Sequence, residues 1–169
     1  EFRTWVGAHV LPGRWVLESN AGDTGQALEN VARILWYGHE SPLDEMNAAA
    51  DTVPIGSEGV FAFLGPPRMD MRRPALRTGG FLFPVPVSFG ELGRHHLTRA
   101  SYEAIAYTIR ANLEQAEALF TSPATDTAVG GGMAHSSNFQ NILSSVLGRK
   151  VRVAPAQASA IGARLCALT

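Results

Sequence analysis

Three consecutive glycines, Gly130, Gly131 and Gly132, join an apolar run that ends at Val129 to a segment, 136–147, with helical periodicity. Glycine permits unusual backbone conformations and leaves bare N–H groups at the positive end of a helix dipole, where anions bind. The spacing is not that of a Walker A loop, since no Gly-Lys-Ser/Thr follows, and the third glycine of a Rossmann fingerprint is absent. These residues therefore predict a tight strand-to-helix turn, and they leave open whether it is purely structural or binds a nucleotide.

Composition limits the classes of protein to which the chain can belong. Its 169 residues suffice for one domain or one lobe of a larger enzyme, with 46% hydrophobic and 17% charged residues. No apolar run approaches the ~18 residues of a membrane span, and a net charge of −1 gives no field that attracts nucleic acid. The single cysteine, Cys166, lies on the apolar stripe of the last predicted helix, which favours core packing and a reducing compartment. We expect a soluble cytoplasmic protein with neither a membrane nor a nucleic acid as partner.

The first half of the sequence predicts a hairpin, two helices and two further strands. Pro12-Gly13 is a turn signal, and Pro42 followed by acidic residues is typical of a helix start. Pro84 and Pro86 favour an edge or a bulge in the strand that contains them. The expected elements are strands 4–11 and 14–19, a helix from Asp23 or Thr24 to Gly38, a short helix from Pro42, and strands 59–64 and 80–87.

Helices and strands alternate in the second half. The sequence predicts a long helix over 98–120, a strand at 127–129, a helix over 136–147 closed by Gly148, a strand at 150–153 and a helix over 157–168. The small residues of the last helix would let it lie close to a neighbour. This alternation favours an α/β fold in which helices cover a sheet.

Three further patterns have ordinary structural explanations that outweigh functional ones. Asp23-Thr24-Gly25 matches the aspartic protease tripeptide, but a single aspartate cannot form a dyad within the chain, and Asp or Thr commonly caps a helix. A protease dimer built around Asp23 stays a minor alternative. His95 and His96 lack an acid or cysteine at metal-ligand spacing. A proline-rich loop carries four arginines that favour solvent exposure over phosphate binding: Arg68, Arg72, Arg73 and Arg77.

Beyond these patterns, the segment GGGMAHSSNFQNILSSVLGRKV, followed by PAQASAIGARLCAL, resembles the adenosine-binding motif and final helix of the FGGY carbohydrate kinases, which include glycerol kinase and xylulokinase. GRWVLESNAGDTGQALENVARIL, SEGVFAFLGPPRMDMRRPALRTGGFLF and HLTRASYEAIAYTIRANLE resemble earlier parts of the same domain, in the same order. Pro84 departs from the family pattern, which has a glycine there. Residues 1–169 are thus similar to the C-terminal, nucleotide-binding domain of the family.

The resemblance implies an actin-like ATPase (ribonuclease H-like) lobe, a mixed sheet flanked by helices. It implies ATP and Mg²⁺ as cofactors, and transfer of the ATP γ-phosphate to a hydroxyl of a sugar or polyol. The catalytic aspartate and the phosphate-binding Gly-Thr-Ser loop would belong to an N-terminal lobe upstream, so no catalytic residue is expected here. The alternative is a non-catalytic actin-like lobe that binds a nucleotide or a partner. The sequence leaves open which sugar is used and whether the protein forms a homodimer.

Nucleotide-binding residues follow from the resemblance one position at a time. Gly132 would approach the adenine and Ser136 would face the base, with Met133 between them in the same motif. Gly130 and Gly131 would shape the turn. Gly25 aligns with a glycine that touches the nucleotide, and Glu29 falls where glycerol kinases have a glutamine.

Overall fold

The computed structural model describes residues 4–22, 24–65, 68–70, 79–84, 92–121 and 126–167. Within them the elements are β1 (Trp5–Ala8), β2 (Trp15–Glu18), α1 (Thr24–Leu35), α2 (Pro42–Ala49), a 3₁₀ turn at Ser57–Gly59, β3 (Phe61–Phe63), β4 (Gly80–Leu82), α3 (Arg94–Glu117), β5 (Ala128–Val129), a 3₁₀ helix at Gly132–His135, α4 (Ser137–Leu147), β6 (Arg152–Val153) and α5 (Ala158–Ala167).

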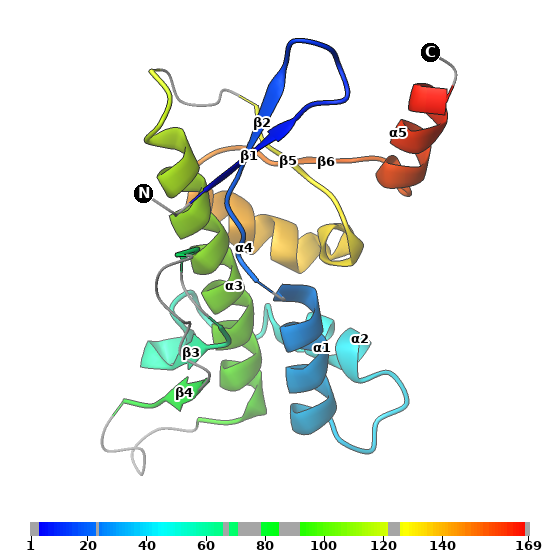
Figure 1. The fold of residues 1–169 in the computed structure, drawn as a ribbon. Helices are drawn as coiled ribbons and strands as arrows, with labels where there is room; N and C mark the ends of the chain where they lie inside the picture. The colour runs from blue at the N-terminus through cyan, green and yellow to red at the C-terminus, as the bar shows by residue number, and fades with distance from the viewer. Residues whose placement is uncertain are drawn as a thin grey trace.

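Helix α3, with 24 residues, forms the centre of the fold. It contacts α1, α2, α4 and β3, and Figure 1 shows it running through the middle of the molecule. The shared core contains the apolar faces that helical periodicity predicts on α1, α3 and α4. Its largest members are Leu28, Trp36, Met46, Tyr102, Ile105, Phe139, Ile142 and Leu143.

Helix α3 begins at Arg94 rather than at Thr98, where the sequence analysis placed its start. The ring nitrogen Nδ1 of His96 accepts a hydrogen bond from the Gly93 N–H at 3.1 Å, which satisfies one donor at the helix N-terminus. The Arg94 guanidinium lies 3.9 Å from the ring centre of Trp36. Neither interaction follows from apolar periodicity, so the first turn escapes a prediction based on it.

The strands form three two-stranded sheets in the described part of the chain. Strands β1 and β2 pair antiparallel, as predicted for the first hairpin, and so do β3 and β4. Strands β5 and β6 pair parallel, with Ala128 opposite Arg152, and α4 supplies the crossover that a parallel pair needs. The second predicted strand of the middle pair, 80–87, is shorter in the structure, and residues 85–91 lie outside those described. Parallel and antiparallel pairs with helices between them fit the α/β class.

Helix α5 forms as predicted, but the structure gives it no buried residue. Figure 1 shows it apart from the helices around α3. The predictions that its small residues pack on a neighbour and that Cys166 lies in a core are therefore wrong for the described chain, where Cys166 is exposed. A helical stripe indicates which face prefers burial, but not whether this chain provides a surface to cover it.

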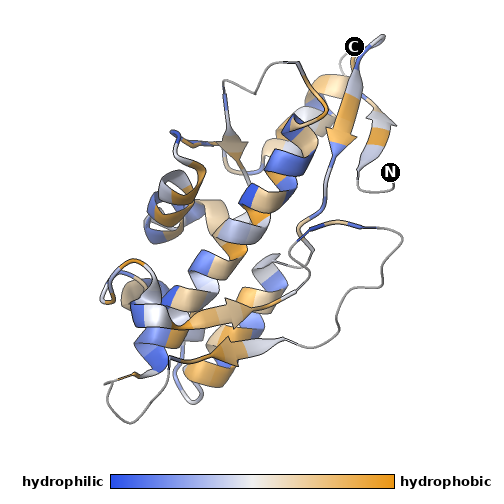
Figure 2. Ribbon diagram, turned by 90° about the vertical axis from the view of Figure 1, so that its left-hand side faces the viewer, coloured by the Kyte–Doolittle hydropathy of each residue, from blue (hydrophilic) through white to orange (hydrophobic). Residues whose placement is uncertain are grey.

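Both antiparallel pairs expose large apolar side chains. Figure 2 shows hydrophobic residues along these strands. The exposed side chains include Trp5, Trp15, Phe61 and Phe63. A two-stranded ribbon has little stability of its own, so these faces are suited to contact with a further surface. Separately, no helix in the described ranges combines the length and apolarity needed to cross a lipid bilayer.

A buried ion pair connects α3 to the turn before β3. The Nε of Arg99 donates to Glu103 Oε1 at 2.7 Å, and both side chains are almost fully buried. The Glu103 carboxylate also accepts hydrogen bonds from the Gly56 N–H at 3.0 Å and the Ser57 hydroxyl at 3.4 Å. Residues 56–59 are left-handed, and the φ values of 50° at Ser57 and 51° at Glu58 are strained for non-glycine residues. Glu103 therefore stabilises a turn that would otherwise be unfavourable.

We predict that Glu103→Ala lowers the free energy of unfolding by about 3 kcal/mol, because it leaves Arg99 buried beside Asp51 alone and removes two acceptors from the strained turn. Chemical denaturation followed by circular dichroism measures the change. Glu114→Ala is a matched control, since Arg110 and Glu114 have the same i,i+4 spacing and the same 2.7 Å distance but are exposed. The control should have no measurable effect, and an equal loss in both variants would contradict the account.

Candidate functional site

The glycine turn has the geometry that the sequence predicts. Strand β5 ends at Val129, and Gly131 follows with φ 94° and ψ 176°, a conformation that is almost exclusive to glycine. One turn of 3₁₀ helix, which the sequence analysis did not anticipate, lies between the glycines and α4. A Cβ added at Gly132 would meet no atom within 4 Å apart from its two chain neighbours, so this residue leaves open space in front of the turn.

Ser136 joins the turn to α4. Its side-chain oxygen accepts a hydrogen bond from the Phe139 N–H at 3.2 Å, which makes it the N-cap of the helix. Gly148, left-handed with φ 65°, ends α4 as predicted. The position of Ser136 is thus fixed by the helix start, and its hydroxyl is already engaged there.

A cavity of about 330 Å³ opens in front of this turn, and we call it the glycine-turn cavity. Its volume lies at the lower end of the range for small-molecule sites. It brings together three of the predicted nucleotide-binding residues, Gly132, Met133 and Ser136, with residues from α1, α2 and α3. The remaining lining residues are Leu28, Leu43, Asp44, Asn47, Tyr102 and His135.

The inner wall of the glycine-turn cavity is held by Tyr102. Its hydroxyl donates to Asn47 Oδ1, and the amide of Asn138 donates to the backbone oxygen of Asn47 at 2.6 Å. Burial raises the pKa of the Tyr102 hydroxyl, and a hydrogen bond with Ser136 opposes that shift in part. Tyr102 therefore stays protonated and acts as a structural donor rather than as an acid or base.

The other predicted site residues lie around the cavity rather than on its lining. Gly130 and Gly131 form the turn behind it. Gly25 is exposed in the first turn of α1, three residues before Leu28, which does line the cavity. Glu29, on the same helix, accepts from Arg33 Nη2 at 2.6 Å in an exposed ion pair.

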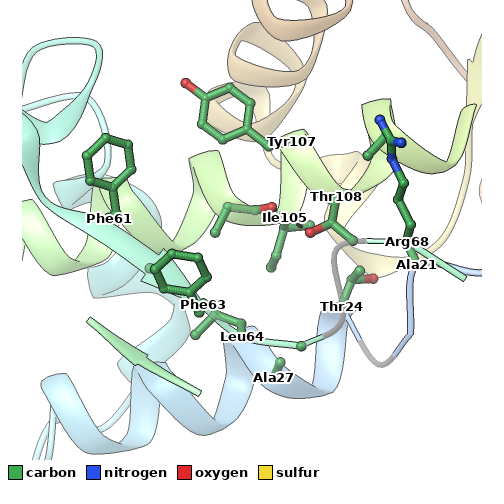
Figure 3. Close-up of a pocket in the computed structure, with 14 residues that line it drawn as sticks. Ala21, Thr24, Ala27, Phe61, Phe63, Leu64, Arg68, Ile105, Tyr107 and Thr108 are labelled. Carbon is green, nitrogen blue, oxygen red and sulfur yellow. Dashed lines mark hydrogen bonds between the residues drawn. The ribbon is translucent and has the colours of Figure 1, made fainter. Parts of the chain in front are cut away.

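A second cavity, of about 360 Å³, lies between α1, α3 and β3. In Figure 3 aromatic rings of Phe61, Phe63 and Tyr107 stand at one end and the Arg68 guanidinium at the other. Helix α1 is a wall of both cavities, because Thr24 and Ala27 line this one and Leu28 lines the glycine-turn cavity. Of the four loop arginines only Arg68 is described, and it is exposed at this cavity.

The adjacent histidines take part in side-chain contacts. His95 Nδ1 lies 2.9 Å from the Thr52 hydroxyl, and His96 Nε2 lies 3.2 Å from Glu58 Oε2. Among the residues that the structure describes, no three His, Cys, Asp or Glu side chains gather as a metal site. Asp23, on which the protease alternative depends, lies outside the described residues.

Sequence reasoning missed Asp44, Asn47 and Tyr102 as members of the site. Asp44 is one of the acidic residues after Pro42 that indicate a helix start, and Tyr102 lies within the long helix predicted over 98–120. The i,i+3 spacing of Asp44 and Asn47 places them on one helix face, which was a readable signal. Their proximity to the glycine turn depends on the packing of α2 against α1 and α3, which no local pattern encodes.

Comparisons with known proteins give one consistent result. YoaC of Bacillus subtilis (strain 168), a protein provisionally named as a sugar kinase, is 29% identical over 167 residues, which cover 95% of this chain and 33% of YoaC. The crystal structure of xylulose kinase from Rhodospirillum rubrum matches with a TM-score of 0.74 and 24% identity, over 96% of this chain and 34% of that one. The match to the Rhodospirillum rubrum structure shows that the two proteins share a fold over this region. The chain spans about a third of the length of either protein.

The sequence model for the C-terminal domain of the FGGY family of carbohydrate kinases matches residues 4–169. That match includes the glycine turn, the glycine-turn cavity and the helices that line it. The chain therefore belongs to the FGGY family of carbohydrate kinases, in which it corresponds to the C-terminal domain.

Proposed function

We propose that this chain is the C-terminal lobe of an ATP-dependent kinase that transfers the γ-phosphate of ATP to a hydroxyl group of a sugar or polyol. The observation that carries the proposal is the glycine-turn cavity, because it lies at the motif that resembles the adenosine-binding motif of the family. The sugar kinase name of YoaC is consistent with it.

In this proposal the adenine occupies the glycine-turn cavity. Leu28 and Leu43 supply apolar contact from α1 and α2, and Met133 supplies it from the turn. Gly132 lets the base approach the backbone closely, since nothing projects from it. The phosphates then extend along α1 toward the exposed Gly25, where the first backbone N–H groups of the helix attract anions. Glu29, already paired with Arg33, contributes least.

The remaining catalytic parts are proposed to lie on an N-terminal lobe of a longer protein. The chain covers about a third of its relatives, and a lobe upstream would supply the catalytic aspartate and the phosphate loop. Magnesium in kinases is held largely by the nucleotide phosphates. The described residues offer no cluster of three acidic or histidine ligands for it, so this part of the chain does not fit a metal site of its own. A cytoplasmic location would give the enzyme its supply of ATP.

We predict that Gly132→Val abolishes ATP binding to the chain without unfolding it. A valine side chain would fill space in front of the turn, while the φ of Gly132 is not left-handed and no chain atom lies within 4 Å of its added Cβ. Isothermal titration calorimetry with ATP measures binding, and thermal denaturation checks the fold.

Gly162→Val is the matched control for that substitution. Gly162 also has open space around its added Cβ, but it lies on the exposed helix α5, away from the residues of the cavity. The control should bind ATP as the unmodified chain does. Equal ATP affinity of the unmodified chain and Gly132→Val would show that the nucleotide does not use this cavity.

We also predict that the chain alone has no sugar kinase activity, because the catalytic base and phosphate loop are assigned to another lobe. An assay of ADP release with a panel of pentoses, hexoses and polyols should give only the background rate. Sugar-dependent ADP release that a carboxylate substitution within this chain abolishes would contradict the prediction, since it would reveal a base in this lobe.

A further inference from the structure

Helix α2 presents two polar side chains to the glycine-turn cavity, Asp44 and Asn47. They are three residues apart and so lie on one face of the helix. Because α2 packs against α1 and α3, this face is held opposite the glycine turn. An acceptor and a donor therefore come from a single rigid element rather than from separate loops.

The existing hydrogen bonds determine what each side chain can still offer a ligand. Asn47 Oδ1 accepts from the Tyr102 hydroxyl, which orients the amide so that its NH₂ group remains the side chain's unused part. Within the described residues, the Asp44 carboxylate makes no side-chain hydrogen bond or ion pair. The Ser136 side-chain oxygen already accepts from the Phe139 N–H as the cap of α4. The polar groups left for a bound base on this wall are thus a carboxylate acceptor and an amide donor.

Adenine carries the complementary pair of groups. Its exocyclic amino group is a donor, and the ring nitrogen beside it is an acceptor, on either edge of the purine. Leu28, Leu43 and Met133 provide apolar surface for the faces of the ring. A carboxylate facing the amino group forms a charge-assisted hydrogen bond, which is stronger than a neutral one.

We propose that Asp44 and Asn47 are the base-recognition residues of this lobe, with Asp44 accepting from the exocyclic amino group of adenine and Asn47 donating to the adjacent ring nitrogen. The inference rests on the proposed function, since it needs the nucleotide base in the glycine-turn cavity. It goes further by assigning the choice of base to α2. In this arrangement Ser136 fixes the helix start and Tyr102 fixes the amide orientation, and neither reads the base.

The test compares ATP with purine riboside triphosphate, which is ATP without the exocyclic amino group. Calorimetry gives the ratio of the two affinities for the unmodified chain and for Asp44→Ala. We expect the unmodified chain to prefer ATP about tenfold, as the loss of one hydrogen bond to a charged group predicts. In Asp44→Ala the ratio should fall to about one, because the partner of the amino group is gone. A general effect of charge on the phosphates changes both affinities alike and leaves the ratio unaltered.

Glu45→Ala is the matched control. Glu45, like Asp44, is an acidic residue in the first turn of α2, where a negative charge interacts favourably with the helix dipole. Unlike Asp44, Glu45 pairs with His39 Nδ1 at 3.2 Å and does not line the cavity. The Glu45→Ala variant should prefer ATP over purine riboside triphosphate by the same factor as the unmodified chain. An unmodified chain that binds ATP without preferring it, or a preference that survives in Asp44→Ala, would overturn this inference and leave the proposed function standing. Failure of the unmodified chain to bind either nucleotide would overturn both.

Discussion

The arrangement of the candidate site depends on Tyr102. Its side chain is almost fully buried on α3, its ring centre lies 6.1 Å from that of Phe139 on α4, and its hydroxyl donates to Asn47 on α2. One residue thus connects α2 and α3, which line the glycine-turn cavity, with α4, which follows the glycine turn. A buried hydroxyl must keep a partner, so the position of α2 relative to the glycine turn is fixed by hydrogen bonding as well as by apolar packing.

The parts that the sequence predicted correctly are those that depend on local chemistry. The turn at Gly130–Gly132, the cap at Gly148 and the first hairpin follow from the conformations that glycine and proline allow. The predicted start of α3 at Thr98 was wrong, because the first turn of the helix depends on contacts distant in sequence. The predicted burial of Cys166 was wrong, because the described chain supplies no surface that covers it. The sequence did not identify Asp44 and Asn47 as site residues, since only tertiary packing brings α2 to the turn.

The two cavities that α1 lines differ in the chemistry of their lining residues. One carries the motif residues and the polar pair of α2, and the other is lined mainly by aromatic and aliphatic side chains with Arg68 at one end. The exposed aromatic residues on β3 lie beside the second cavity, on a surface suited to contact with another lobe. We propose the first cavity, and not the second, as the place where the nucleotide binds.

An NMR titration of the isotope-labelled chain with ATP shows whether the base of ATP occupies the glycine-turn cavity. If it does, the largest amide shifts occur at Gly132, Met133 and Ser136, with a shift of the Asn47 side-chain amide at the same ATP concentrations. Shifts centred instead on Thr24, Ala62 and Thr108, which line the second cavity, would contradict it.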